Sequence, residues 1–514
     1  MREILTLQIG SLANFVGSHF WNFQDEMLGL ASDSLSDPVF QNLHNYVDMN
    51  VLYRSGETHQ GILTYTPRLL SIDHQGSLGS ISSRGSLYQS SSIDPSRTIT
   101  WSGDVSVIET PPRKRNLFLQ RLHEDETKTQ TPDLQRDVEP TDKDIVEDLE
   151  KTVEFWTDYS KVHFHPQSLL EFNELSMDSE GERVDEIAEK LRFFAEECDH
   201  IQGFQFIIGD SGEFTSLAAN MMEHVCDEYA KSPLFLYNVM GYPNENRPNP
   251  KRMNDAVSFA RFSSLCSLIT PVGLPFLSRS TAAKHLKIDD EKKYHCSAVY
   301  AAAIHSVTLP FRLNHAGPTG THQWSSGGSD MRFLEEMMTG QGRRSIVSVL
   351  DLALPPPSIK AKQTDGSFLK CLHSLTPEVS ETEDSQAIES VAVQGLLKEG
   401  GGYASVDDAI GAVRKAYESV GTRPNMWEAS AARCPLPIPL PYPRIFSEEI
   451  ESIAVATRLR SSKAVLPFVE RRLKEFVRLK KWNNAADDSS EMEEMLYRMV
   501  ANLNDCDEFS SDSE

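Results

Sequence analysis

Two stretches of this 514-residue sequence share one order of pattern: an apolar run, a short turn, and then apolar residues at helical spacing. The first is residues 3–21, in which a strand-like alternation leads into a turn at residues 10–14. The second is residues 203–229, in which a largely apolar run leads into a glycine-containing turn at residues 209–212. A strand that leads through a tight turn into a helix is the building unit of a parallel α/β sheet. The sequence therefore predicts an α/β fold.

Both turns are candidate anion sites, because the first backbone N–H groups of a helix are unpaired and the helix dipole favours negative charge there. Residues 67–73 form a third candidate strand, which ends in Asp73 at the position where functional loops often follow parallel strands. The second turn holds Asp210 and is followed by Glu213, and each carboxylate would oppose a bound anion. The alternative is that the glycines of this turn only allow the backbone conformation of the turn and do not bind an anion.

The common catalytic and nucleotide motifs are absent. No GxxxxGK[S/T] sequence occurs, no GxGxxG follows a candidate strand, and neither GxSxG nor HExxH is present. His163 and His165 would share one face of an extended segment and could be two metal ligands, but the spacing indicates no third ligand. We therefore expect ordinary structural histidines, no metal site and no catalytic residue.

The charge and the cysteines restrict the class of partner. With 75 acidic and 50 basic side chains, the net charge of −25 repels phosphate backbones, so we expect no nucleic-acid partner. No run of about 18 apolar residues occurs, so no transmembrane segment is predicted. The seven cysteines form no CxxC pair, which favours reduced structural thiols. The first residues, with Glu3 beside Arg2, are unlike an import sequence, so we expect residence in the cytoplasm.

The remaining chain alternates between polar and apolar stretches. Residues 76–143 are rich in Ser, Gly, Pro, Thr and charge, and most of this segment is predicted to be a disordered insertion. Residues 296–307 are small and apolar on all sides, which predicts a buried helix. A helix with one apolar stripe and several basic residues is predicted from Pro467, and the chain turns acidic after Trp482.

The first 21 residues, MREILTLQIGSLANFVGSHFW, resemble the opening of tubulin. The matching residues are Gln8, Gly10, Asn14, Gly17, Phe20 and Trp21. Four further segments are WTDYSKVHFHPQSL from Trp156, EECDHIQGFQ from Glu196, YHCSAVYAAAIHSVTLPFRL from Tyr294 and PLPIPLPYPRIF from Pro435. Through these segments the chain more closely resembles the Misato family, which comprises tubulin-like eukaryotic proteins associated with mitochondrial distribution and morphology.

The resemblance implies a tubulin-like architecture with a parallel-sheet, nucleotide-binding-like first domain. We expect this domain over residues 1–290, with the disordered insertion at about 76–143. A central helix follows at residues 291–313. A second, smaller α/β domain is expected at 314–446, C-terminal helices at 447–482 and an acidic tail at 483–514.

The resemblance also implies a degenerate nucleotide site. Its residues would be Gly10, Ser11, Leu12, Asn14, Asp73, Gly209, Ser211, Gly212 and Lys293. Ser11 and Leu12 stand where tubulin has Gln and Cys, Gln75 replaces an acid near the magnesium, and Lys293 lies near the position of an Asn that reads the base. Tubulin also uses a carboxylate in the segment after its central helix to hydrolyse the GTP of a neighbouring subunit. No carboxylate occurs here between Phe311 and Ser329.

These departures favour a non-catalytic adaptor with no cofactor. The resemblance to the Misato family implies that this adaptor is peripheral to the outer surface of the mitochondrion and is needed for mitochondrial distribution, morphology and inheritance. Mitochondrial outer-surface proteins are then the expected partners. The alternative is a protein that binds GTP or GDP and polymerises or acts on microtubules and the spindle. A further alternative is work in tubulin assembly, with tubulin or the cytosolic chaperonin as partner.

Overall fold

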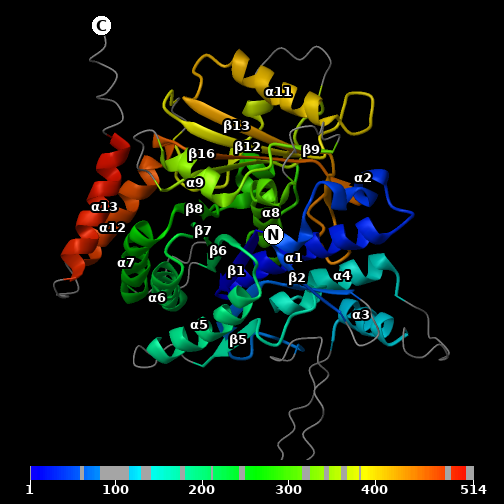
Figure 1. The fold of residues 1–514 in the computed structure, drawn as a ribbon, viewed down its shortest axis with the longest axis horizontal. Coiled ribbons are helices and arrows are strands. Elements are labelled where there is room, and N and C mark those ends of the chain that lie inside the picture. The colour runs from blue at the N-terminus through cyan, green and yellow to red at the C-terminus, as the bar shows by residue number, and fades with distance from the viewer. Residues whose placement is uncertain are drawn as a thin grey trace, which may run out of the picture.

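The computed structural model describes residues 2–57, 63–81, 115–128, 140–173, 180–209, 212–241, 249–314, 324–340, 346–359, 367–380, 384–480 and 488–504. Two six-stranded sheets form the body of the molecule, and a central helix, α8 (Lys293–Val307), runs between them (Figure 1). This arrangement confirms the predicted α/β class with a second sheet domain. No helix in the described part of the chain is long and apolar enough to cross a membrane.

The first sheet is parallel throughout. Its strands, in spatial order, are β5 (Leu169–Phe172), β4 (Leu69–His74), β1 (Glu3–Ile9), β6 (Ile201–Gly209), β7 (Leu234–Val239) and β8 (Leu268–Val272). All seven residues of β1 are buried, as a central strand covered on both faces requires. The three strands predicted from the sequence, at residues 3–10, 67–73 and 203–208, are therefore neighbours in the order β4, β1, β6.

Helices cover both faces of this sheet. On one face α1 (Ser11–Ser32) packs against α8, and side chains such as Ile4 and Ile207 point toward them. The other face carries α5 (Glu180–Glu196), α6 (Gly212–Glu228) and α7 (Asn249–Leu265), and alternate side chains such as Leu5 and Ile208 point that way. The strand alternation and the two helix layers are consistent, because successive side chains of a strand point to opposite faces.

The second sheet is mixed. Its strands, in spatial order, are β11 (His373–Ser374), β10 (Val349–Ala353), β16 (Val455–Ser461), β12 (Ile388–Gln394), β13 (Met426–Ala432) and β9 (Ser325–Ser326). Its inner face packs on α8, and its outer face carries α10 (Ser367–Lys370) and α11 (Val406–Ser419). Helix α9 (Met331–Thr339) lies near β12 and β16 and also contacts β6 of the first sheet.

Smaller elements complete the described fold. Two short hairpin-like pairs are β2 (Tyr53–Glu57) with β3 (Leu63–Pro67) and β14 (Leu436–Pro437) with β15 (Ser452–Ile453). A one-turn helix, α2, spans Pro38–Gln41. Short 3-10 helices lie at Leu43–Asn45, Met49–Val51, Trp156–Tyr159, Leu277–Arg279, Thr281–Ala283, Leu309–Arg312 and Lys463–Val465.

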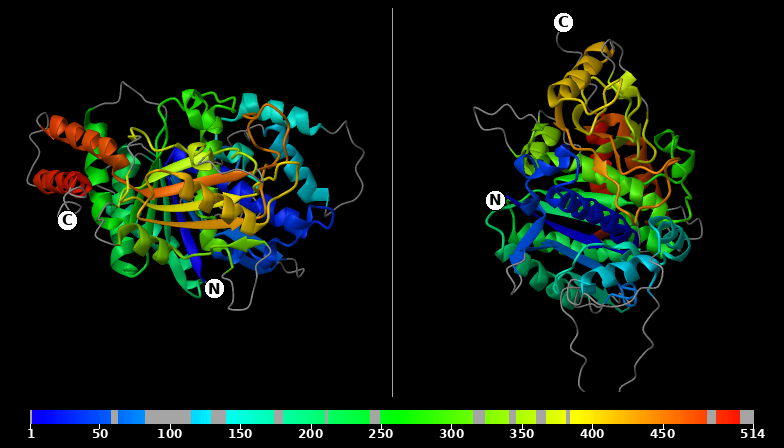
Figure 2. Two further views of the ribbon diagram at one scale, coloured as in Figure 1. Left: turned by 90° about the horizontal axis from the view of Figure 1, so that it is seen from above. Right: turned by 90° about the vertical axis from the view of Figure 1, so that its right-hand side faces the viewer.

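The structure differs from several of the expected segments. Within the expected disordered insertion, α3 (Leu117–Lys128) is helical and packs on α4 (Asp142–Thr152). The second domain extends past residue 446, because β16 is one of its internal strands. The C-terminal helices are α12 (Leu466–Lys480) and α13 (Asp488–Asn504), so the expected acidic tail contains a helix. These helices and the α3 and α4 pair lie at opposite ends of the molecule (Figure 2).

Helix α13 forms because part of its surface is apolar despite the acidic composition. Leu496 and Leu503 are buried, and Met492 and Met499 pack against the same apolar core. This face contacts α12 and α7. Burial of this apolar stripe stabilises the helix, which its charged residues alone would not stabilise.

Candidate functional site

The predicted site residues gather at the carboxyl ends of β4, β1 and β6. The helix after β1 lies on one face of the sheet and the helix after β6 lies on the other. In open α/β sheets, ligands bind at the carboxyl ends of two neighbouring parallel strands when the helices after these strands lie on opposite faces of the sheet. Three predicted site residues stand at this position, the switch point of the sheet: Gly10 directly follows β1, Asp73 is the second-last residue of β4 and Gly209 is the last residue of β6.

The turn between β1 and α1 leaves backbone donors at the start of the helix. Gly10 has φ 95°, a conformation that favours glycine, and its amide donates to the Ile72 carbonyl at 2.9 Å. No side chain caps α1, and its first turn has no acidic residue. A Cβ at position 209 would lie 3.4 Å from the Ala13 nitrogen and 3.6 Å from the Leu12 Cβ. The glycine therefore keeps the space beside the first α1 amides free of a side chain.

Asp73 is the carboxylate of the switch point, and it is directed into the protein. Its side chain is 2% exposed; Oδ2 accepts from Asn14 Nδ2 at 3.1 Å and Oδ1 accepts from the His74 amide at 2.9 Å. Asn14 also donates to the Ile72 carbonyl at 3.0 Å and accepts from Ser71 Oγ at 2.8 Å. Burial raises the pKa of Asp73, although these hydrogen bonds oppose the rise. The carboxylate thus belongs to a closed internal network.

Lys293 contributes the positive charge of the site. It is the first residue of α8 and is exposed, and its Nζ donates to Ser11 Oγ at 3.1 Å. The same Nζ lies 5.7 Å from the centre of the Phe15 ring. The ammonium therefore lies beside the uncapped start of α1, where its positive charge and the positive end of the helix dipole both favour an anion. This contact joins α1 and α8, which are 282 residues apart in sequence.

Seven of the nine predicted site residues thus lie at or beside the carboxyl ends of β4, β1 and β6: Gly10, Ser11, Leu12, Asn14, Asp73, Gly209 and Lys293. Gly212 begins α6, and Ser211 lies outside the described residues. Sequence reasoning missed Ser71, which a period-2 reading of the strand would have placed on the same face as Asp73. Whether these residues bind a nucleotide stays a prediction.

The residues present fit a nucleoside triphosphate only in part. The uncapped α1 amides and Lys293 suit a phosphate. The half-buried Leu12 donates no side-chain hydrogen bond, and both oxygens of Asp73 already accept hydrogen bonds. The Asp73 carboxylate is buried and held by two protein donors, so a phosphate-bound metal ion is the less well matched part of such a ligand.

The segment after α8 is anchored to the first domain. The Asn314 amide donates to the Tyr46 carbonyl at 2.9 Å, and Leu313 forms an isolated bridge with Val47. Arg312 is fully buried and donates to Gln24 Oε1 and to the His305 carbonyl. The described backbone here serves the packing of α8.

The histidine pair has structural surroundings. His165 stacks on Phe193 with ring centres 4.9 Å apart, and burial lowers its pKa. The described residues contain no group of three or more His, Cys, Asp or Glu side chains placed to hold a metal ion. The structure therefore assigns His165 a packing role beside α5.

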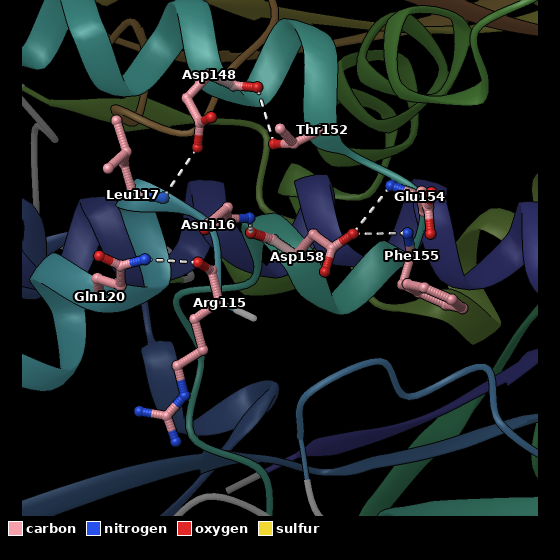
Figure 3. Close-up of a pocket in the computed structure, with 9 residues that line it drawn as sticks. All are labelled: Arg115, Asn116, Leu117, Gln120, Asp148, Thr152, Glu154, Phe155 and Asp158. Carbon is pink, nitrogen blue, oxygen red and sulfur yellow. Dashed lines mark hydrogen bonds between the residues drawn. The ribbon is translucent and has the colours of Figure 1, made fainter. Parts of the chain in front are cut away.

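A second pocket, of about 300 Å³, lies between α3, α4 and the 3-10 helix Trp156–Tyr159 (Figure 3). Asp158 Oδ2 accepts from the amides of Glu154 and Phe155 at 2.9 and 2.8 Å. Asp148 Oδ2 accepts from the Leu117 amide at 2.9 Å. These two carboxylates of the pocket therefore cap and fix the local backbone.

Comparison with known proteins gives consistent matches along most of the described chain. A family model described as Misato Segment II tubulin-like domain matches residues 2–124, and a model described as Tubulin domain matches residues 147–313. Protein misato homolog 1 of Homo sapiens is 30% identical over 350 residues, which cover 61% of this chain and 60% of the relative. The corresponding protein of Bos taurus is 28% identical over 413 residues, which cover 73% and 68%.

A more distant relative is Protein dml-1 of Neurospora crassa, which is 27% identical over 380 residues that cover 70% of this chain and 64% of the relative. The chain thus spans about three fifths of the length of the human relative. The matched regions include β1, β4, β6 and α8, and hence every strand of the switch point.

Proposed function

The chain belongs to the Misato family of tubulin-like proteins, and from this premise we propose that it acts as a non-catalytic adaptor in mitochondrial distribution, morphology and inheritance. Its site of action would be the cytoplasm and the outer surface of the mitochondrion. The tubulin-like fold would then serve as a binding scaffold.

The observation that carries this proposal is the state of Asp73. Its two oxygens are engaged by Asn14 and by the His74 amide, and the side chain is buried. A carboxylate that is to bind a metal ion or to position water has to present an oxygen to the ligand. Asp73 supports the junction of β4 and α1 from inside, which is the role of a structural residue.

The segment after α8 gives further support. Tubulin-like hydrolysis needs a carboxylate there, and the sequence has none between Phe311 and Ser329. Loss of a side-chain donor at position 12, where leucine stands, would also weaken phosphate binding, since each charge-assisted hydrogen bond contributes about 1.5–3 kcal/mol. Both changes favour a protein that retains the fold without the reaction.

The partners proposed for this adaptor are proteins. The net charge of −25 favours partners with basic surfaces. Mitochondrial outer-surface proteins, tubulin and the cytosolic chaperonin are the candidates. Recovery of bound proteins from cells, followed by mass spectrometry, tests each of them, and absence of both tubulin and chaperonin would remove those two.

A pair of substitutions at Ser11 tests the adaptor proposal. Ser11→Glu adds a carboxylate at the start of α1, where it suits the helix dipole, can pair with Lys293 and repels phosphate. Ser11→Gln is the matched control, because it has the same length without the charge. Both variants would be expressed in cells that lack the chain, and the purified proteins would be assayed for GTP turnover.

The adaptor proposal predicts that both variants restore normal mitochondrial distribution equally and that neither they nor the wild-type protein turn over GTP. The contrary outcome is a folded Ser11→Glu protein that fails to restore distribution while Ser11→Gln succeeds. That result would mean that a phosphate has to occupy the switch point.

A second candidate function is a GTP-binding protein that polymerises or acts on microtubules. The uncapped start of α1 and the adjacent Lys293 favour it, because together they suit an anion. Sedimentation with GTP and magnesium, with and without microtubules, tests this function. A protein that stays in the supernatant in both cases would exclude it.

A further inference from the structure

The outer face of the second sheet is divided into two halves of opposite character. One half is apolar and is covered by α10 and α11; its residues include Ala353, Val391, Val393, Ala431 and Ala456. The other half carries four charged side chains on the same face of β10, β12 and β16: Asp351, Glu389, Arg458 and Arg460. The change from apolar to charged occurs within single strands, two residues apart.

A cavity of about 670 Å³ lies over the charged half. Its walls come from β10, β11, β12 and β16, from the end of α10, from the last turn of α11 and from the chain after each helix. Leu274 and Thr281, which lie between β8 and α8, complete the lining. This volume is in the range of pockets that hold small organic ligands. The cavity is on the opposite face of the sheet from α8, and its lining includes none of the switch-point residues.

The charged side chains form a cross-strand network. Arg458 donates to Asp351 Oδ2 through Nε at 2.8 Å and lies 3.4 Å from Glu389 through Nη1. Arg460 contacts the same Asp351, with its Nε 2.9 Å from Oδ2. Tyr417 of α11 donates to Glu389 Oε2 at 2.5 Å. Burial alone would raise the pKa of Asp351, but the two guanidinium groups hold it below its usual value.

Folding stability does not account for this network. Replacing a buried ion pair with apolar residues of similar size is often neutral or stabilising, since desolvation offsets the attraction between the charges. The adjoining half of the same sheet face has such apolar residues and packs well under α11. A cluster of four charges beside a cavity is therefore more consistent with a binding role.

The carboxylates of the cavity have partners, whereas cationic donors remain. Glu378 pairs with Arg471, and Asp384 accepts from Ser462 Oγ at 2.8 Å and from the Lys463 amide at 2.9 Å. In the described part of the chain, the exposed Lys370 ammonium and the Nη1 group of Arg460 make no hydrogen bond. The unsatisfied groups of the lining are thus donors that carry positive charge.

The wall around these donors is partly apolar. Leu369 and Leu372 are buried beside the cavity, and Val420 follows the last turn of α11. The hydroxyl groups of Ser374 and Thr376 lie in the same wall but are engaged within the protein, because they donate to the carbonyls of Thr376 and Pro271 at 2.9 and 2.8 Å. An occupant that matches this lining has an anionic end and a short apolar body.

We propose that this cavity binds a small organic anion, whose carboxylate or phosphate group contacts Arg460 and Lys370 and whose apolar part packs on Leu369, Leu372 and Val420. A single charged end suits the site, because Asp351 and Glu389 pair with Arg458 and Asp351 also pairs with Arg460, which leaves Lys370 and the Nη1 edge of Arg460 as the cationic groups for an anion. This proposal is independent of the adaptor function and of nucleotide binding at the switch point.

Four probes of one chain length separate the requirements of the site: hexanoate, hexyl phosphate, hexanol and hexylammonium. Their binding to the full-length protein would be measured by ligand-observed NMR and isothermal titration calorimetry. We expect at least one of the two anions to bind and hexanol and hexylammonium to bind far more weakly. The tighter of the two anions identifies the charged group as carboxylate or phosphate.

Four variants locate the binding. Lys370→Ala should weaken the anion about tenfold, the effect of losing one charge-assisted contact. Arg460→Lys keeps a cation beside Asp351 but removes the guanidinium edge, and it should also weaken binding. Lys415→Ala, an exposed lysine of α11 outside the cavity, is the matched control and should leave the affinity unchanged. Lys293→Ala should leave it unchanged as well.

Three results would overturn the proposal. The first is no binding of either anion at millimolar concentration. The second is equal binding of hexanol, which would mean an apolar site without charge recognition. The third is an affinity for the anion that does not change in Lys370→Ala, whether or not Lys293→Ala weakens binding. This result would place the anion outside the cavity. Lys370 is exposed, so its variant keeps the test valid even where Arg460→Lys unfolds.

Discussion

Replacing Asn14 with alanine tests whether the polar residues of the switch point are structural. Asn14 is fully buried, donates to the Ile72 carbonyl and to Asp73, and accepts from Ser71. Asn14→Ala removes all three hydrogen bonds and leaves the Asp73 carboxylate buried with one partner fewer. Neutral hydrogen bonds contribute about 0.5–1.5 kcal/mol each and one to a charged group about 1.5–3, so we expect a loss of about 3–5 kcal/mol.

The assay is chemical unfolding of nucleotide-free protein, followed by circular dichroism. Asn45→Ala is the control, because Asn45 is exposed and its side chain bonds only locally, to Asn42 at 3.3 Å. We expect the control to change stability by less than about 0.5 kcal/mol. The reasoning is refuted if Asn14→Ala costs less than about 1 kcal/mol without nucleotide but abolishes stabilisation by added GTP, because Asn14 would then be a ligand group.

Three further predictions concern packing and pH. Gly17→Ala should destabilise the protein by about 1–3 kcal/mol, since the new Cβ would lie 2.1 Å from the Gln8 side chain. Gly29→Ala, in the same helix, should stabilise the protein by about 0.5–1 kcal/mol, since its Cβ would meet nothing within 4 Å. Thermal unfolding of the two variants compares these effects. Burial opposes ionisation of Glu150, but hydrogen bonds from the start of α8 and from a backbone amide lower its pKa to about 2. The ionised carboxylate should therefore stabilise the fold above pH 4.5, and this contribution should be lost as the pH falls to about 2. The Glu150→Gln variant should lack this pH dependence. Asp73 should show the opposite pH dependence, because its pKa is raised in the folded protein, which therefore binds the proton more tightly than the unfolded chain. As the pH falls through this raised pKa, the wild-type protein should gain stability relative to the Asp73→Asn variant.

The elements around the switch point could be predicted from the sequence because each has a strong local signal. Strand β1 has a strand-like alternation and strands β4 and β6 are largely apolar runs, and each is followed by a turn that glycine or a polar residue marks. The resemblance to tubulin placed Lys293 near the site. Its contact with Ser11 could not be read from spacing, because it depends on how α8 packs against α1.

The charged half of the second sheet left no recognisable pattern. Asp351, Glu389 and Arg458 come from three strands separated by many residues, and their pairing depends on strand register. Helices α3 and α13 were missed for another reason. Their charged composition is typical of a solvated segment, and the few apolar residues that bury, such as Leu496 and Leu503, are significant only once α12 is in place.

The nucleotide content of the purified full-length chain tests the central claim most directly. The protein would be denatured, and released nucleotide would be quantified by chromatography with tubulin as the positive control. The adaptor account predicts no stoichiometric guanine nucleotide and no rise in unfolding temperature when GTP and magnesium are added. Near-stoichiometric GTP or GDP would contradict it, because Gly10, Lys293 and the start of α1 would then form a working nucleotide site.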